Sequence, residues 1–118
     1  MLTEQDIQRV WDEAPIVDGY NKDIVRKDCC GAWIVRSEYG KTTPFGWEVD
    51  HTYPEAKGGK TEPINLRAMH WENNRSKADD FPVYNVAVQA KGNVNQNVTD
   101  VMYKINDSLR IQLEDRYN

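Results

Sequence analysis

The chain has 118 residues, of which 39% are hydrophobic and 29% charged, and these values predict one soluble domain over residues 1–118 with a small core. No apolar run approaches the roughly 18 residues of a membrane helix. Residues 1–6 are acidic and lack a secretion-signal pattern, so a cytoplasmic protein with no membrane partner is expected. The formal net charge of −4 disfavours a protein that coats nucleic acid, because phosphate binding needs a basic surface.

The placement of charges and cysteines adds detail. Basic side chains outnumber acidic ones in residues 51–77, whereas the reverse holds in residues 1–28, so weak or assisted DNA binding stays open.

Cys29 and Cys30 are the only cysteines. Without a second pair at Cys-x-x-Cys spacing, a self-contained four-cysteine zinc site is excluded. We expect two reduced thiols, at least one of them buried.

The first predicted element is a helix over about residues 4–14. Thr3 and Asp6 form a capping-box pattern, and an apolar repeat of helical spacing follows until Pro15. An apolar run over residues 31–35, rich in strand formers, then predicts the first strand.

A second strand over residues 47–49 is predicted to carry Asp50 and His51 to its end. A loop follows, then a brief strand over residues 66–69 and a helix over residues 70–78. The predicted local order is therefore strand, long loop, strand, helix.

The remaining chain predicts a β-hairpin and a last helix. Residues 84–90 and 101–105 alternate between apolar and polar side chains, with a polar hairpin tip at residues 93–97. Asn106 or Asp107 can cap the final helix. Helices and strands are mixed without repeats, so the sequence predicts an α+β fold.

Asp50 and His51 suit the two needs of phosphodiester hydrolysis, a base for water and a cation for the developing charge. An imidazole with an ordinary pKa of about 6.5 is mostly neutral at physiological pH, so His51 is the predicted base. A carboxylate is a hard oxygen ligand, so Asp50 is predicted to bind Mg²⁺ or Mn²⁺. Successive strand residues point to opposite faces, so the two side chains need not compete for one position.

The predicted helix adds further candidates. His70 and Asn74 are four residues apart, which would place them on one helix face, close enough to share the metal ion. Lys77 follows on the same face and can reach a phosphate. Arg75 points elsewhere and is expected to clamp a DNA backbone or to face solvent.

The loop over residues 52–64 carries Lys57 and Lys60, two further predicted nucleic-acid contacts. Asn65 follows this loop. An amide has both donors and an acceptor, so Asn65 can tie the two ends of the loop together and hold His51 in place.

Several of these elements occur in the same order and spacing in one known family. They are Asp50-His51, Gly58-Gly59, Asn65 and Asn74-Arg75-Ser76-Lys77. In these residues the chain resembles the HNH endonucleases of the ββα-metal, or His-Me finger, superfamily. In residues 26–34 and 70–74 it is similar to their small stand-alone bacterial or phage members. The motif core spans about residues 44–80.

The resemblance implies an α+β fold with a ββα-metal core, preceded by an N-terminal helix and followed by a C-terminal β-hairpin plus helix. It implies His51 as general base, Asp50 and Asn74 as metal-binding residues, and Asn65 as the residue that orients the loop. It also implies metal-dependent hydrolysis of DNA that leaves 5′-phosphate and 3′-hydroxyl ends.

Two departures from the family pattern bear on metals. Many members hold a structural zinc with two Cys-x-x-Cys pairs. Here Cys29-Cys30 stands roughly at the first pair and His70 with Asn73 at the second, so no complete structural zinc site is expected. His70 also stands where colicin-type members of the family have a metal-binding histidine. It is therefore a candidate metal ligand or, alternatively, a packing residue beside Trp71. The expected cofactor is one divalent ion, Mg²⁺ or Mn²⁺, with Zn²⁺ or Ni²⁺ as alternatives.

Three functions are open at this level. The first is a DNA endonuclease with low intrinsic specificity, or with specificity supplied by a protein partner. The second is a non-catalytic module that binds nucleic acid or a partner and keeps the fold, which the acidic composition favours. The third is a toxin-like nuclease effector that needs an immunity partner.

Overall fold

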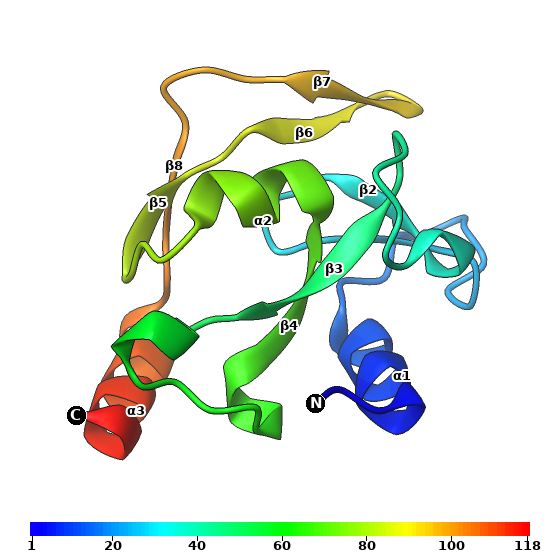
Figure 1. Cartoon of the computed structure of the whole chain (residues 1–118). Helices are drawn as coiled ribbons and strands as arrows, with labels where there is room; N and C mark the ends of the chain where they lie inside the picture. Colours follow the sequence, from blue (N-terminus) through cyan, green and yellow to red (C-terminus); the bar gives the residue numbers. More distant parts are fainter.

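The computed structural model describes all 118 residues as an α+β fold with three helices and four small antiparallel sheets (Figure 1). The helices are α1 (Glu4–Glu13), α2 (Trp71–Lys77) and α3 (Asp107–Tyr117). The paired strands are β1 (Val25–Lys27) with β2 (Trp33–Val35), β3 (Trp47–His51) with β4 (Leu66–His70), β5 (Val83–Asn85) with β8 (Met102–Lys104), and β6 (Val88–Lys91) with β7 (Val94–Asn97). The predicted α+β class is confirmed. No helix has both the length and the apolar character needed to cross a bilayer.

Helix α1 forms as its sequence predicts. Thr3 Oγ1 accepts a hydrogen bond from the Asp6 backbone N–H at 3.1 Å, and Asp6 returns the contact by accepting from the Thr3 N–H at 2.9 Å. The buried face of the helix places Trp11 against Trp47, with ring centroids 5.4 Å apart. Burial of these two indoles joins α1 to the β3–β4 hairpin and makes one of the two main apolar clusters.

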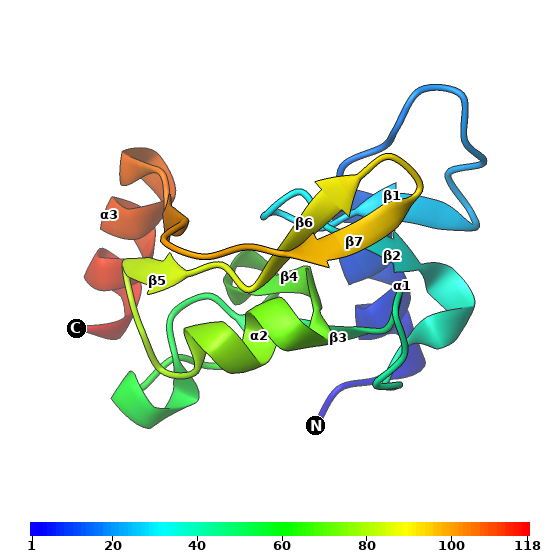
Figure 2. The same cartoon turned by 90° about the horizontal axis from the view of Figure 1, so that it is seen from above.

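The predicted order of strand, long loop, strand and helix is confirmed over β3, β4 and α2. The two strands pair antiparallel, with Asp50 directly opposite Arg67 and His51 opposite Leu66. Helix α2 follows β4 immediately and contacts both strands and β5 (Figure 2). The helix therefore brings its own side chains next to the end of β3.

The start of α2 differs from the predicted helix over residues 70–78. His70 is the last residue of β4 and the N-cap of α2, with non-helical φ −50° and ψ 140°. Its ring Nδ1 accepts a hydrogen bond from the Glu72 N–H at 3.1 Å, which satisfies a helix N–H that has no partner within the helix. His70 and Asn74 consequently do not share a helix face.

The C-terminal strands pair differently from the predicted hairpin of residues 84–90 with 101–105. Strand β5 does pair with β8, but β6 pairs with β7, so residues 94–97 form a strand and not a hairpin tip. The side chain of Asn95 explains why residues 94–97 form a strand. Asn95 Oδ1 accepts from the Trp33 N–H at 2.7 Å and its Nδ2 donates to the Trp33 carbonyl at 2.9 Å, which fixes β7 beside β2.

Helix α3 begins after Asn106, which caps it by accepting from the Leu109 N–H at 2.9 Å, as the sequence predicts. Near its end, Arg116 makes two hydrogen bonds to the Glu62 carboxylate, at 2.8 and 3.0 Å. Because Glu62 lies in the loop between β3 and β4, the last helix anchors the loop that follows His51.

Candidate functional site

Three of the predicted site residues meet in one polar cleft of about 310 Å³. They are Asp50 and His51 at the end of β3, and Asn74 on α2. The other residues that line the cleft are Val49, Pro54, Glu55, Ala78 and Asp79. The ββα order of the elements thus brings Asn74 to Asp50 and His51, which lie 24 and 23 positions earlier in the sequence.

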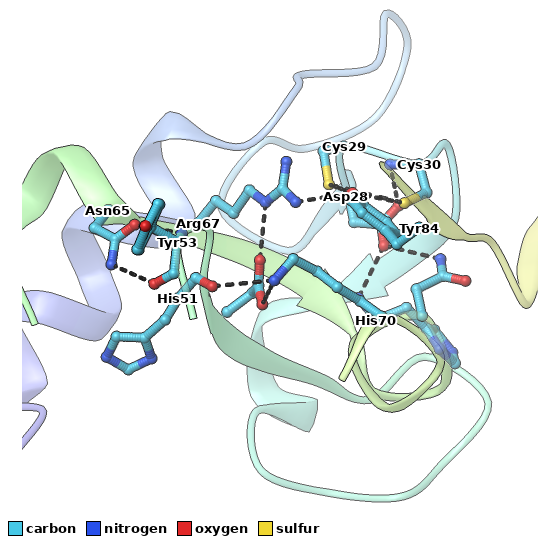
Figure 3. Close-up of polar contacts among 12 residues, drawn as sticks. Asp28, Cys29, Cys30, His51, Tyr53, Asn65, Arg67, His70 and Tyr84 are labelled. Carbon is cyan, nitrogen blue, oxygen red and sulfur yellow. Dashed lines mark hydrogen bonds and ion pairs between the residues drawn. The ribbon is translucent and has the colours of Figure 1, made fainter. Parts of the chain in front are cut away.

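Asp50 is almost fully buried at the base of this cleft, with 4% of its surface exposed. Its Oδ2 accepts a hydrogen bond from Arg67 Nε at 3.1 Å, and its Oδ1 lies 3.3 Å from Lys77 Nζ (Figure 3). Two cationic side chains from different elements therefore contact the two oxygens of this carboxylate. A carboxylate has about four lone-pair positions, so two remain for a further ligand.

Lys77 does not have the position predicted for a nucleic-acid contact, because its side chain is fully buried. Its Nζ also donates to the His51 carbonyl at 3.1 Å, so it fixes the end of β3. Burial lowers the pKa of Lys77, and the nearby Asp50 carboxylate opposes that shift. This lysine neutralises Asp50 from within the fold and has no surface to offer a phosphate.

The other predicted nucleic-acid contacts are on the surface. Lys57 and Lys60 are exposed in the loop that supplies Glu55 to the cleft. Arg75 is exposed on α2, where its guanidinium lies 3.5 Å from a Glu48 carboxylate oxygen. Their contact with nucleic acid stays a prediction.

His51 lies at the rim of the cleft with its ring partly exposed. The ring Nε2 is 2.9 Å from Thr61 Oγ1, and Nδ1 is 3.7 Å from a Glu55 carboxylate oxygen. Nε2 is thus held by a hydroxyl group, whereas Nδ1 has only the more distant Glu55 carboxylate as a polar neighbour.

Asn65 is fully buried and joins both ends of the loop after His51. Its Oδ1 accepts from the Tyr53 N–H at 2.7 Å, and its Nδ2 donates to the carbonyls of Tyr53 and Lys60, each at 3.0 Å. Gly59 passes so close that a Cβ there would lie 1.9 Å from the Tyr53 carbonyl oxygen, so only glycine fits. The amide closes the loop, and its catalytic importance through His51 stays a prediction.

Asn74 has one free metal-ligating atom. Its Nδ2 donates to Glu48 Oε1 at 3.2 Å, and its side-chain oxygen Oδ1 has no hydrogen bond within the protein. With Asp50 it supplies two hard oxygen donors to one cleft, the type of donor set that Mg²⁺ and Mn²⁺ use with water completing the shell. No group of three or more His, Cys, Asp or Glu side chains gathers to hold a metal ion.

His70 lies outside the cleft and is fully buried. Its Nε2 is 2.9 Å from the Pro44 carbonyl, to which it donates, while its Nδ1 accepts from the Glu72 N–H. Because both ring nitrogens already have partners, the predicted role as a metal ligand does not fit this structure. His70 is a helix-capping residue, stacked beside Trp71.

Sequence reasoning missed two residues that hold the site together, Arg67 and Asp28. The position of Arg67 opposite Asp50 becomes visible only with the β3–β4 register. The buried Asp28 accepts four hydrogen bonds. The donors are the N–H groups of Cys30, Ala32 and His70 and the side-chain amide of Asn73, at 2.9, 2.8, 2.9 and 3.1 Å. Asp28 thereby links the two segments at which the family resemblance would place zinc-binding pairs.

No family model matches this chain, and neither a curated protein nor a solved structure matches it.

Proposed function

We propose that the chain is a metal-dependent endonuclease of the HNH type, with a ββα-metal core formed by β3, β4 and α2, and that it hydrolyses phosphodiester bonds of DNA. The observation that carries the proposal is the shared cleft of Asp50, His51 and Asn74. A general base and two oxygen ligands meet there, on elements in the order that the family resemblance implies.

His51 serves as the base. In the tautomer whose Nε2–H donates to Thr61 Oγ1, the lone pair of Nδ1 is free to remove a proton from a water molecule as its oxygen attacks phosphorus. The Glu55 carboxylate, 3.7 Å from Nδ1, then stabilises the imidazolium that forms. Closure of the loop by Asn65 keeps this ring at the cleft rim.

Asp50 and Asn74 would hold the divalent ion through their side-chain oxygens. When bound, Mg²⁺ or Mn²⁺ stabilises the negative charge that develops on the phosphate and on the leaving oxygen. Arg67 and Lys77 fix the orientation of Asp50, because they bind its two oxygens from different elements. The site is thus organised before substrate arrives.

The exposed basic residues Lys57, Lys60 and Arg75 would bind the DNA backbone beside the cleft. Such contacts depend strongly on salt and carry little sequence information. A partner protein or a DNA structure would then supply the specificity.

The test is to incubate supercoiled plasmid with the protein and Mg²⁺ or Mn²⁺, alongside the variants His51→Ala and Asn74→Ala. Loss of the base should slow cleavage by roughly 10²- to 10⁴-fold, because positioned proton transfer contributes that much. The exposed Gln112→Ala in α3 serves as the surface control and should cut normally. If wild type leaves the plasmid intact with every metal, or His51→Ala cuts equally well, the proposal is wrong.

The second candidate is a non-catalytic nucleic-acid-binding module with the same fold. The ion pairs of Asp50 favour it, since Arg67 and Lys77 already neutralise the carboxylate without a metal. A mobility shift of DNA that persists in the presence of a chelator, together with an intact plasmid, would support this function.

A further inference from the structure

The two adjacent thiols lie at one end of a chain of polar contacts that reaches the cleft. Cys29 and Cys30 occupy a turn closed by the Gly31 N–H, which donates to the Asp28 carbonyl at 3.1 Å. Their Sγ atoms are 3.9 Å apart, and each lies near the Tyr84 hydroxyl, at 3.7 and 3.6 Å respectively (Figure 3). Both sulfurs thus share one hydroxyl partner.

The Tyr84 hydroxyl also accepts a hydrogen bond from Arg67, whose NH2 group lies 2.8 Å away. The same guanidinium donates through Nε to Asp50, the carboxylate at the base of the cleft. Three successive contacts therefore connect the sulfur atoms to the carboxylate that we propose as a metal ligand.

The two thiols differ in access and in acidity. Cys29 is partly exposed and lines a cavity of about 310 Å³ between α1, β4 and α3, whereas Cys30 is buried. The hydrogen bond from Cys30 lowers the pKa of Cys29 against the effect of burial, and the Arg67 charge lowers it further. The same contact raises the pKa of Cys30. An accessible, acidic thiol beside a second thiol is the arrangement of a redox-sensitive pair.

We infer that Cys29 and Cys30 form a redox modification site, oxidised by a hydroperoxide to a disulfide between neighbouring residues, and that this bond slows catalysis at the cleft through Tyr84 and Arg67. The regulatory half of the inference rests on the proposed nuclease function. The oxidation of Cys29 and Cys30 to a disulfide does not depend on that function.

The oxidation has two steps. The Cys29 thiolate attacks one peroxide oxygen and the O–O bond breaks. The leaving oxygen takes a proton and departs as water from hydrogen peroxide, or as an alcohol from an organic hydroperoxide. Cys30 then loses its proton and attacks the sulfur of the Cys29 sulfenic acid, so that the S–S bond forms and the S–O bond breaks, with the oxygen leaving as water. Two thiols lose two electrons in total, and the peroxide gains them.

Neighbouring cysteines have Cα atoms about 3.8 Å apart, closer than in most disulfides, so the bridge must distort the turn and is easily reduced again. Once the two sulfurs are joined, neither keeps its present position beside the Tyr84 hydroxyl. The Tyr84 hydroxyl shifts with them, and Arg67 loses part of the support that holds it on Asp50.

The experiment compares reduced protein with protein treated with hydrogen peroxide, using intact mass, thermal unfolding and plasmid cleavage. Oxidised monomer should lack two hydrogen atoms, unfold at a lower temperature and cut roughly tenfold more slowly, as expected for one weakened charge-assisted hydrogen bond. Dithiothreitol should restore all three properties. Neither Cys29→Ser nor Cys30→Ser should form the bridge. Tyr84→Phe should form it without a further change in cleavage.

Oxygen adducts or linked dimers without an internal bridge would overturn the modification site. A bridged protein that unfolds and cuts like the reduced one would overturn the coupling to Asp50. If reduced protein cuts no plasmid, the nuclease proposal fails alone, and the unfolding temperature then decides the coupling, with a lower value in the bridged form supporting it and an equal value contradicting it. Because wild type is compared with itself, a serine variant that fails to fold does not affect the result.

Discussion

Two almost fully buried aspartates, Asp28 and Asp50, have different kinds of polar partners. Asp28, 2% exposed, accepts four hydrogen bonds from N–H groups and has no cation within ion-pair distance. Asp50, 4% exposed, has two cations, Arg67 and Lys77, and it alone of the two lines a cleft. The same residue type therefore holds segments together in one region and lines a cleft, paired with two cations, in the other.

The two carboxylates differ in how much of their hydrogen-bonding capacity the fold uses. Every Asp28 oxygen is used to join the turn at residues 28–31 to the start of α2, so this carboxylate has no capacity for a ligand. Asp50 has one cation at each oxygen, which leaves lone pairs for a further ligand, and it lines the cleft. Mutations around Asp28 should therefore affect folding alone, whereas mutations around Asp50 should also affect the proposed cleavage.

The largest expected effect on stability is that of Asp28→Ala. The substitution leaves four buried donors without their acceptor, which should lower the free energy of unfolding by about 4 kcal/mol, a large part of the total for a domain of this size. Urea denaturation would measure it. The exposed Asp23→Ala is the matched control and should change stability by less than about 0.5 kcal/mol. An Asp28 variant as stable as wild type would remove the structural half of the comparison.

Lys77→Met should have the next largest effect. It removes a buried cation from Asp50 while keeping most of the side-chain volume, and should cost about 3 kcal/mol of unfolding free energy as well as slowing cleavage. Lys57→Met, at an exposed position, is the control: it should leave stability unchanged and weaken DNA binding in a salt-dependent way. Denaturant titration would measure the stability of both variants. Equal free energies of unfolding would contradict the buried position of Lys77.

The smallest expected effect concerns the contact between the loop and α3. Hydrogen bonds from Arg116, then Tyr117, lower the pKa of Glu62 to about 2. Because the folded pKa lies below the ordinary value of 4.5, the ion pair contributes fully above that pH and loses its contribution as the pH falls toward 2. The unfolding temperature of Glu62→Gln should therefore differ from wild type more at about pH 7 than at about pH 3. If the difference in unfolding temperature between wild type and Glu62→Gln did not change with pH, the Glu62–Arg116 ion pair would contribute no pH-dependent stability.

Much of the fold could be predicted where the signal is local. Thr3 and Asp6 mark the start of α1, and the alternation around β3 and β4 places Asp50, His51 and Asn74 on neighbouring elements. The rest depends on contacts distant in sequence.

The role of Arg67 needs the strand register, and the role of His70 depends on whether the helix begins at that residue or one later. The alternating pattern around β6 could not reveal that a polar segment would become its partner, because Asn95 is held by Trp33 from another sheet. Long-range polar contacts, more than apolar periodicity, decided these outcomes.

The most direct measurement is a crystal structure of His51→Ala with Mn²⁺ and an uncleaved DNA duplex, with data collected at the manganese absorption edge. We predict one anomalous peak about 2.1 Å from a side-chain oxygen of Asp50 and from one of Asn74, with a phosphate oxygen in the same shell. An ion bound without either residue, or bound at His70, would contradict the assignment of the cleft as the catalytic centre.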